Sequence, residues 1–436
     1  MSRQFFTISL AAVFSSTLFS AEWHAFRGAD GNGKSPDTGL QKQWESGGPK
    51  LLWTANFIGM GWSGVTISGD RIYTSGTVGD HSMVFCLDKN GNKIWEKDNG
   101  PAVHTVADTY PRARNYPGTR GTPTIDSTNG EYYVYDASAL GEVTCYDAKT
   151  GEKIWNRNLT ADYGAPLPTW CLGHSVIVDG DNIIAPVGGP KTIAVALNKR
   201  TGETVWEAAS VACPTFINPE RNNPTGIVAA GYTTPYLFEF DGIRVVTVMS
   251  EATVEGLESK TGKTLFSIPW SNSRNVHCTM PIYHNGHLFL TTGYEGGAAK
   301  LFRLTKNTDG TISPAEVWTE ERFNNHHGGV VLVGDHVYGT NHSGSWCSIN
   351  FMTGEIGYTS RAAGKGSVHY ADGLLYGLTE IDKTVLLIKP EPKQFALVSS
   401  FELPNDAPRQ SWAHPVVLDG RLYLRHGQYL YCYDVK

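Results

Sequence analysis

Hydrophobic and polar positions along the chain repeat one pattern: a short apolar segment, an Asp, Asn or Glu, a turn containing Gly, and a large aromatic residue. The pattern is clearest over residues 86–95 and 145–155, and it returns over 196–206, 256–266 and 347–358. Copies spaced about 40–60 residues apart indicate a repeat protein in which each copy is one structural unit. Because short apolar runs alternate with turns in every copy, the units are predicted to be all-β.

Upstream of these copies, two further apolar runs flank a turn dipeptide that contains glycine. Such dipeptides are a strong hairpin signal, because a tight turn needs a positive φ angle. They are Gly69-Asp70, Gly180-Asp181, Asp241-Gly242, Asn285-Gly286, Gly334-Asp335, Asp372-Gly373 and Asp419-Gly420. Each unit is therefore predicted to contain four strands, A to D, with the aromatic residue on strand D. Four-stranded units repeated about an axis form a β-propeller, and we expect the aromatic residues to pack between neighbouring blades.

The number of strand-D aromatic residues determines how the ring closes. They stand at Trp53, Trp95, Trp155, Trp206, Phe266, Trp318 and Tyr358, with a weaker copy over residues 395–399. No strands A to C precede Trp53, whereas residues 415–434 provide three strands and no fourth. Residues 50–55 are therefore predicted to pair with the C-terminal hairpin, so that an eight-bladed propeller of four-stranded antiparallel blades closes without an unpaired edge. The predicted organisation is a propeller over 50–436 and an N-terminal arm over 21–49.

Residues 1–20 combine one basic residue, Arg3, with an apolar run over 5–19 and a small residue, Ser20, followed by Ala21. This order is typical of a secretory signal peptide that is cleaved near Ser20 or Ala21. A membrane anchor is the alternative, but Ser and Thr interrupt the run, which is short for a bilayer span. No Cys follows the run to carry a lipid, and no later segment is long and apolar enough to span a membrane. We therefore expect a periplasmic or secreted protein.

Composition agrees with many short strands and weighs against nucleic acid as a partner. The 436 residues include 48 Gly, 12 Trp and 20 Tyr, which suits tight turns and aromatic-rich strands. Charged residues make up 18% of the chain, below the usual quarter, and the net charge is −6. A mildly acidic chain without a run of basic residues repels a phosphate backbone.

The seven cysteines fall into two groups. Those in the first group have a similar position in the repeat, two residues before an Asp or Asn, or three in the case of Cys347, which indicates a small buried side chain: Cys86, Cys145, Cys347 and Cys432. The second group lies outside that position: Cys171, Cys213 and Cys278. In an exported protein two of these three can form a disulfide, and the odd total leaves at least one thiol free within the chain.

The connections between blades indicate which face is functional. Links from strand D to the next strand A are long at 97–120, 161–173, 208–231, 271–277 and 405–411. Binding residues concentrate where long loops share one rim of a rigid scaffold.

On that rim the first residues of the A strands are expected to surround the channel. They combine indole, imidazole and cationic groups: Trp62, Arg120, Trp170, His174, His277, His327, Lys365, Trp412 and His414. Such a funnel suits a planar, anionic or sugar-like ligand; alternatively, these side chains only join the blades and fill the channel mouth.

We do not expect a metal site, although four histidines belong to this ring. Zinc needs its ligands close around one point, and His174, His277, His327 and His414 belong to different blades. Residues 30–33, Asp-Gly-Asn-Gly, are similar to the opening of a calcium loop, but the later ligand positions are missing.

Nearly the whole chain after residue 21 resembles the pyrroloquinoline-quinone-type eight-bladed propellers. Within them it is similar to secreted bacterial repeat proteins related to the BamB outer-membrane assembly factor. The resemblance rests on the repeat itself, on Trp-His-Ala-Phe-Arg-Gly over 23–28 followed by 30–33, and on Trp-Ala-His-Pro over 412–415. It implies the propeller fold, but function has to be argued from a site.

The resemblance implies two classes of function. Quinone dehydrogenases hold pyrroloquinoline quinone with calcium over the channel, and alcohol-oxidising members stack the quinone on a disulfide of adjacent cysteines. This chain has no adjacent Cys pair and no Cys-x-x-Cys-His haem attachment sequence, although Arg120 and Lys365 could meet the carboxylates of a quinone. We therefore expect a binding or scaffold protein for an envelope protein, a glycan or a small molecule. The alternative is a quinone-dependent oxidoreductase acting on an alcohol or a sugar.

Overall fold

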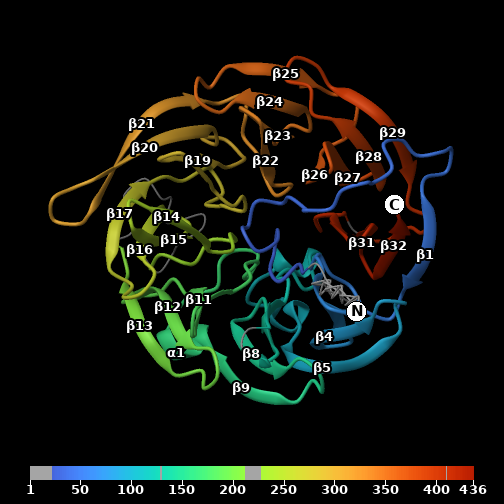
Figure 1. Ribbon diagram of the computed structural model, residues 1–436. Coiled ribbons are helices and arrows are strands. Elements are labelled where there is room, and N and C mark those ends of the chain that lie inside the picture. Colours follow the sequence, from blue (N-terminus) through green and yellow to red (C-terminus); the bar gives the residue numbers. More distant parts are fainter. Residues whose placement is uncertain (1–21, 128–129, 212–226, 409) are drawn as a thin grey trace, which may run out of the picture.

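Eight four-stranded antiparallel sheets form a closed ring in the computed structural model, which describes residues 22–127, 130–211, 227–408 and 410–436 (Figure 1). The predicted eight-bladed propeller is thereby confirmed. In the first seven blades the strands follow one another in sequence order from A to D. The predicted signal segment, residues 1–20, and Cys213 lie outside the described residues. Within the described part of the chain, no helix has both the length and the apolar character of a membrane span.

The blades are numbered here in chain order. Blade 1 consists of β2 (Thr66–Ser68), β3 (Arg71–Val78), β4 (His81–Asp88) and β5 (Lys93–Pro101), and blade 2 of β6 (Thr124–Asp126), β7 (Tyr133–Ala137), β8 (Glu142–Asp147) and β9 (Lys153–Asn158). Blade 3 consists of β10 (Ile177–Asp179), β11 (Asn182–Pro186), β12 (Thr192–Asn198) and β13 (Thr204–Ala209), and blade 4 of β14 (Tyr236–Phe240), β15 (Ile243–Met249), β16 (Thr253–Glu258) and β17 (Thr264–Pro269).

The second half of the ring repeats this arrangement. Blade 5 consists of β18 (Ile282–His284), β19 (His287–Thr291), β20 (Ala299–Lys306) and β21 (Ile312–Glu320), and blade 6 of β22 (Val330–Val333), β23 (His336–Thr340), β24 (Trp346–Asn350) and β25 (Ile356–Ser360). Blade 7 consists of β26 (Gly366–Ala371), β27 (Leu374–Thr379), β28 (Thr384–Lys389) and β29 (Ala396–Glu402), and blade 8 of β30 (Val416–Leu418), β31 (Arg421–His426), β32 (Tyr429–Asp434) and the N-terminal β1 (Lys50–Ala55).

Blade 8 closes the ring as the sequence predicts. Strand β1 pairs antiparallel with β32, from Lys50 opposite Asp434 to Ala55 opposite Leu430. The outermost strand of the last blade therefore comes from the beginning of the propeller. This pairing ties the two ends of the chain together, so neither end strand is left as an open edge.

The apolar core is divided among the junctions between blades. Eight clusters of buried side chains each combine residues of two neighbouring blades, one cluster at every junction around the ring. Cys86, Cys145 and Cys432 each lie opposite a strand-D tryptophan, whereas Cys347 lies one residue earlier, because Ser348 is the residue opposite Tyr358. All four cysteines are buried and free. They act as small core residues, as the repeat indicates.

The glycine-containing turn and the strand-D tryptophan of the repeat meet across five of the eight junctions. Trp155 of blade 2 donates its indole N–H to the carbonyl of Lys199 at 3.0 Å, in the turn that precedes Gly202 of blade 3. Gly202 has a φ of +73°, and a Cβ there would lie 2.8 Å from the Trp155 ring. Glycine therefore provides both the left-handed turn and the room for the indole. The tryptophans at 53, 95, 206 and 318 donate in the same way.

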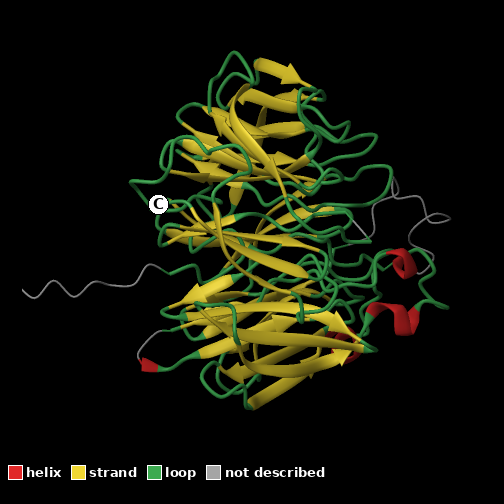
Figure 2. Ribbon diagram, turned by 90° about the vertical axis from the view of Figure 1, so that its right-hand side faces the viewer, coloured by secondary structure: helices red, strands yellow, loops and turns green. Residues whose placement is uncertain are grey.

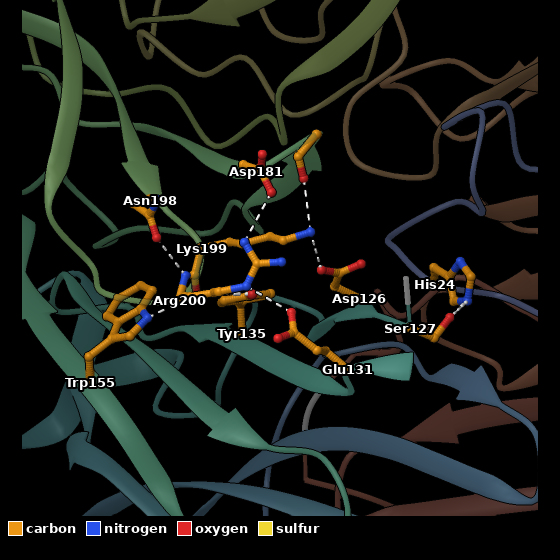
Figure 3. Close-up of polar contacts among 11 residues, drawn as sticks. His24, Asp126, Ser127, Glu131, Tyr135, Trp155, Asp181, Asn198, Lys199 and Arg200 are labelled. Carbon is orange, nitrogen blue, oxygen red and sulfur yellow. Dashed lines mark hydrogen bonds and ion pairs between the residues drawn. The ribbon is translucent and has the colours of Figure 1, made fainter. Parts of the chain in front are cut away.

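Around this indole a buried ion pair also joins blades 2 and 3 (Figure 3). Lys199 Nζ lies 2.7 Å from Asp126 Oδ2, and the two side chains are only 3% and 2% exposed. The carbonyl of Lys199 accepts from the hydroxyl of Tyr135 at 3.1 Å as well as from Trp155. On the surface above, Arg200 pairs with Glu131 at 2.8 Å. The junction therefore combines apolar packing with charges that satisfy each other.

The N-terminal arm crosses the central channel before the chain enters β1 (Figure 1). Its beginning bonds to the innermost strands of blades 1 and 2, where Trp23 pairs with Ile67 and the carbonyl of His24 accepts from Ile125 N–H. Arg27 reaches blade 6, donating to the carbonyl of Val330 at 2.5 Å. Further along, backbone bonds to Tyr370 hold the arm against blade 7. Contacts on both sides of the ring place the arm inside the channel.

Connections D–A and B–C share one face of the ring, as expected from the alternation of strand directions. The short helices η1 (Val103–Val106), η2 (Ala113–Asn115) and α1 (Leu159–Tyr163) all belong to D–A connections. These connections form the right-hand side of the molecule in Figure 2. This loop-bearing face is the one that the sequence indicates as functional.

Candidate functional site

A cavity of about 290 Å³ opens at the centre of the loop-bearing face. D–A connections from most blades contribute to it, together with two B–C turns and one residue of the N-terminal arm. The lining residues are Phe26, Trp62, Tyr116, Arg120, Trp170, Gly173, Ser175, Tyr232, Thr234, Val276, Cys278, Tyr294, His326, His327, Glu380, Gln410, Trp412 and His414. The scaffold thus brings side chains that are up to about 390 residues apart in sequence to one hollow.

Six of the nine residues selected from the sequence line this cavity: Trp62, Arg120, Trp170, His327, Trp412 and His414. Lys365 lies behind the wall, where its Nζ is 3.3 Å from Glu380 Oε2 and 2.9 Å from His326 Nδ1. The structure places His174 and His277 outside the lining, 3% and 1% exposed. Their sequence neighbours form the lining instead, because successive side chains of an extended segment point to opposite sides.

Burial determines the charge of these two histidines. It lowers the pKa of His174 and of His277 to about 4, so both rings are neutral at pH 7. His277 Nε2 donates to the carbonyl of Trp270 at 3.1 Å, which fixes the ring in the blade rather than in the cavity. Both side chains are therefore buried among the blades and do not line the cavity.

Arg120 gives one side of the cavity a positive charge. Its Nη2 donates to the carbonyl of Tyr116 at 2.8 Å, and its guanidinium lies 5.8 Å from the centre of the Trp62 ring. Its Nη1 makes no hydrogen bond, and no carboxylate of the described residues forms an ion pair with this side chain. Burial lowers the pKa of Arg120. The guanidinium still remains charged at neutral pH, because its ordinary pKa is above 12.

On another side of the cavity Glu380 is surrounded by donors. Trp412 Nε1 donates to Glu380 Oε1 at 2.8 Å, and His327 Nε2 lies 3.5 Å from the same oxygen. Burial by itself would raise the pKa of Glu380, but His327, the charge of Lys365 and the Trp412 N–H outweigh it and lower the pKa to about 2. The carboxylate is therefore ionised and already paired with Lys365.

Aromatic rings form most of the remaining wall. Trp412 stacks on Tyr116 with ring centres 5.2 Å apart and on Trp62 with centres 4.9 Å apart. Trp62 Nε1 donates to the carbonyl of Gln410 at 2.7 Å, which holds the indole in place. Trp170 packs against Tyr232 at 6.4 Å. Because the rings support one another, the wall is formed before any ligand binds.

Phe26 of the N-terminal arm forms the floor of the cavity. The same side chain also lines a second cavity of about 570 Å³, formed mainly by the arm and the innermost strands of blades 2 to 4. Its ring lies edge-on to His414 with centres 5.0 Å apart. Arg27 supports it from behind, donating to His414 Nδ1 at 2.9 Å. The arm therefore turns the channel mouth into a closed cup.

Several of these residues gave no usable signal in the sequence. Glu380 and Tyr294 lie in B–C turns, where an isolated polar or aromatic residue is indistinguishable from a solvated turn residue. Tyr116 lies inside a long D–A connection, and Phe26 lies in an arm without a repeat partner. The two turn residues, Glu380 and Tyr294, could have been selected only by noting that B–C turns lie on the same face as the long D–A connections.

The lining does not fit pyrroloquinoline quinone held with calcium. Calcium takes six to eight oxygen ligands, whereas Glu380 is the single carboxylate in the lining and is engaged by Lys365. The described residues contain no group of three or more His, Cys, Asp or Glu placed to hold a metal ion.

Cys171 and Cys278 are both free thiols, so these two do not form the disulfide that the sequence allows.

The fold and the cup on its loop-bearing face define a propeller of the pyrroloquinoline-quinone type. The family described as outer membrane protein assembly factor BamB matches residues 45–225 and 139–396, so the chain belongs to this family and the predicted resemblance is confirmed. A curated relative, tetrathionate hydrolase of Acidithiobacillus ferrooxidans, is 27% identical over 161 residues. That match covers 36% of this chain and 30% of the relative, less than a third of its length.

Solved structures share the architecture at low sequence identity. BamB from Moraxella catarrhalis superimposes with a TM-score of 0.60 and 14% identity, covering 88% of this chain and 99% of that protein. Quinohemoprotein alcohol dehydrogenase from Comamonas testosteroni gives a TM-score of 0.61 and 13% identity, covering 95% of this chain and 80% of that enzyme. At identities this low the likeness shows a common fold alone.

Proposed function

We propose that this propeller is a binding protein that holds a ligand in the cup on its loop-bearing face. The observation that carries the proposal is a preformed, aromatic-walled cavity of about 290 Å³ that contains the guanidinium of Arg120, for which the described residues provide no carboxylate partner. Few, well-placed polar groups in an apolar concave site are the usual features of a ligand pocket. Membership of a family described as an assembly factor supports binding rather than catalysis.

A quinone-dependent oxidation is the weaker candidate. The enzymatic structural neighbour shares only the fold, and the single lining carboxylate, Glu380, is held in an ion pair with Lys365. The same pair leaves no free carboxylate in the cup to accept a proton from an alcohol. We therefore advance binding as the function of this site.

The proposal is tested with a panel of four probes: 4-hydroxybenzoate, 4-hydroxybenzyl alcohol, N-acetylglucosamine and maltose. At least one probe is expected to bind with one site per chain in titration calorimetry, and Trp170→Ala or Trp412→Ala is expected to weaken it at least 10-fold, because each indole is part of the wall. The matched control is Tyr132→Ala, an aromatic residue that is 37% exposed and outside the cup. If none of the probes binds, or if the wall variants bind as well as the wild type, the cup is not a ligand site.

We further propose that the protein acts in the cell envelope after export. The apolar segment at residues 5–19 and membership of the assembly-factor family support this location. Mass spectrometry of the protein expressed with its native N-terminus should find a chain that begins near Ala21 in the envelope fraction. An uncleaved chain recovered from the cytoplasm would contradict export.

A further inference from the structure

The charged groups of the cup leave one positive charge without a partner. Lys365 and Glu380 lie 3.3 Å apart and neutralise each other. His326 carries no charge at pH 7, because burial and the charge of its neighbours lower its pKa well below the usual value. His414 is neutral for the same reason. Arg120 is therefore the one cation among the described lining residues without a carboxylate partner, and one carboxylate would balance it. Arg27, behind Phe26, is outside the lining and directs its guanidinium to His414 and to the carbonyl of Val330.

The polar groups of the cup stand on opposite sides of the ring. Arg120 precedes blade 2, whereas His327 precedes blade 6, four blades further around the eight-bladed ring. Neither ring nitrogen of His327 makes a hydrogen bond, and the nearest carboxylate oxygen, of Glu380, is 3.5 Å away. A neutral imidazole can donate from one nitrogen and accept at the other. It can therefore bind a hydroxyl group of a ligand whose acidic end lies across the cup.

Between these two ends the cup offers flat aromatic surface. The stacked rings of Trp62, Trp412 and Tyr116 stand beside Arg120, and a volume of about 290 Å³ admits a single ring with its substituents rather than a polymer chain. Phe26 closes the floor, so the ligand is limited in depth. Aromatic walls favour a ligand that has an apolar, planar face.

We propose that the cup binds a small aromatic monocarboxylate that carries a hydroxyl group. The carboxylate accepts hydrogen bonds from the guanidinium of Arg120, the ring lies along the aromatic wall, and the hydroxyl bonds to His327. This inference rests on the proposed binding function and narrows it to one ligand class. Pyrroloquinoline quinone falls outside the class, because its several carboxylates exceed the single unpaired charge.

Titration calorimetry with wild-type protein compares 4-hydroxybenzoate with 4-hydroxybenzyl alcohol, which has the same ring and hydroxyl but no charge. The acid is expected to bind at least 10-fold more tightly, because its hydrogen bonds to Arg120 are charge-assisted. Arg120→Met is expected to remove this advantage, because it should weaken binding of the acid far more than binding of the alcohol. The matched control is Arg322→Met, whose side chain is 72% exposed and outside the cup.

Two further measurements keep the test independent of misfolding. Arg120→Lys retains the charge without the two-pronged geometry and should keep part of the preference for the acid. If the imidazole of His327 binds the hydroxyl, benzoate should bind several-fold more weakly than 4-hydroxybenzoate to the wild type. The two acids should bind with equal affinity to His327→Ala.

Equal affinities of the wild type for acid and alcohol, or an unchanged affinity of Arg120→Met for the acid, would overturn the inference while the binding function stands. Failure of every probe would remove both.

Discussion

Lys199→Met is expected to lower the free energy of unfolding by about 3–5 kcal/mol, because the substitution leaves the carboxylate of Asp126 buried without its cation. The two side chains are 3% and 2% exposed, so water cannot replace the lost partner. The ion pair lies at the junction of blades 2 and 3, beside Trp155. The loss of stability should therefore be local to this junction. Urea denaturation followed by tryptophan fluorescence measures the change.

The double substitution Lys199→Met with Asp126→Leu separates the charge effect from the packing effect. Removing both charges should recover most of the lost stability, because a buried pair contributes little beyond an apolar pair of similar volume. Lys306→Met is the matched control. Its ammonium lies 3.4 Å from Asp241 at the surface, with side chains 38% and 63% exposed, and its loss should cost less than about 1 kcal/mol. A Lys199→Met protein with the same free energy of unfolding as the wild type would show that the ion pair does not stabilise the junction of blades 2 and 3.

Arg425→Met is expected to destabilise the closure of the ring by about 3–5 kcal/mol. Arg425 on β31 is 2% exposed, and it donates from blade 8 to the carbonyls of Ser75 and Gly59 and to Thr74 Oγ1. Burial lowers the pKa of Arg425 to about 9, so the side chain is still charged at pH 7. Methionine fills a similar volume but leaves these buried acceptors without a donor, and each such loss costs about 1–3 kcal/mol.

Hydrogen exchange shows where the Arg425→Met protein opens. Amides of β1 and β32 should exchange faster than in the wild type, because these strands close the ring beside the lost contacts. Amides of blade 4, on the far side of the ring, should be little changed. Arg303→Met on the exposed side of β20 provides the control and should behave as the wild type. Faster exchange spread evenly over all blades would contradict a local role in closure.

The blade repeat could be predicted from the sequence because each of its residues has a local task. Gly202 needs a positive φ and has no room for a Cβ, and Trp155 fills the space above it. These requirements recur in five junctions, and the same residue types therefore recur at the same spacing. Closure followed from counting strands, since an incomplete first blade and an incomplete last blade can only complete each other.

The candidate site was only partly accessible to the same reasoning. Trp170 and Arg120 could be selected because they lie shortly before innermost strands, on the face that carries long loops. His174 was selected on the same basis but lies outside the lining, because a shift of one residue along an extended segment turns the side chain to the other side. Glu380 and Phe26 come from a turn and from the arm, where no repeat partner marks a position as part of the channel.

By itself the sequence determined the number of blades, the strand order within them and the way the ring closes, because these depend on residue patterns that are local and repeated. Only the tertiary structure decided that Lys365 neutralises Glu380. It also decided that, within the described part of the chain, His327 keeps both ring nitrogens free of hydrogen bonds and Arg120 has no carboxylate partner. The physical reason is that pairing of charges across the channel depends on distances between different blades, and no spacing along the chain encodes those distances.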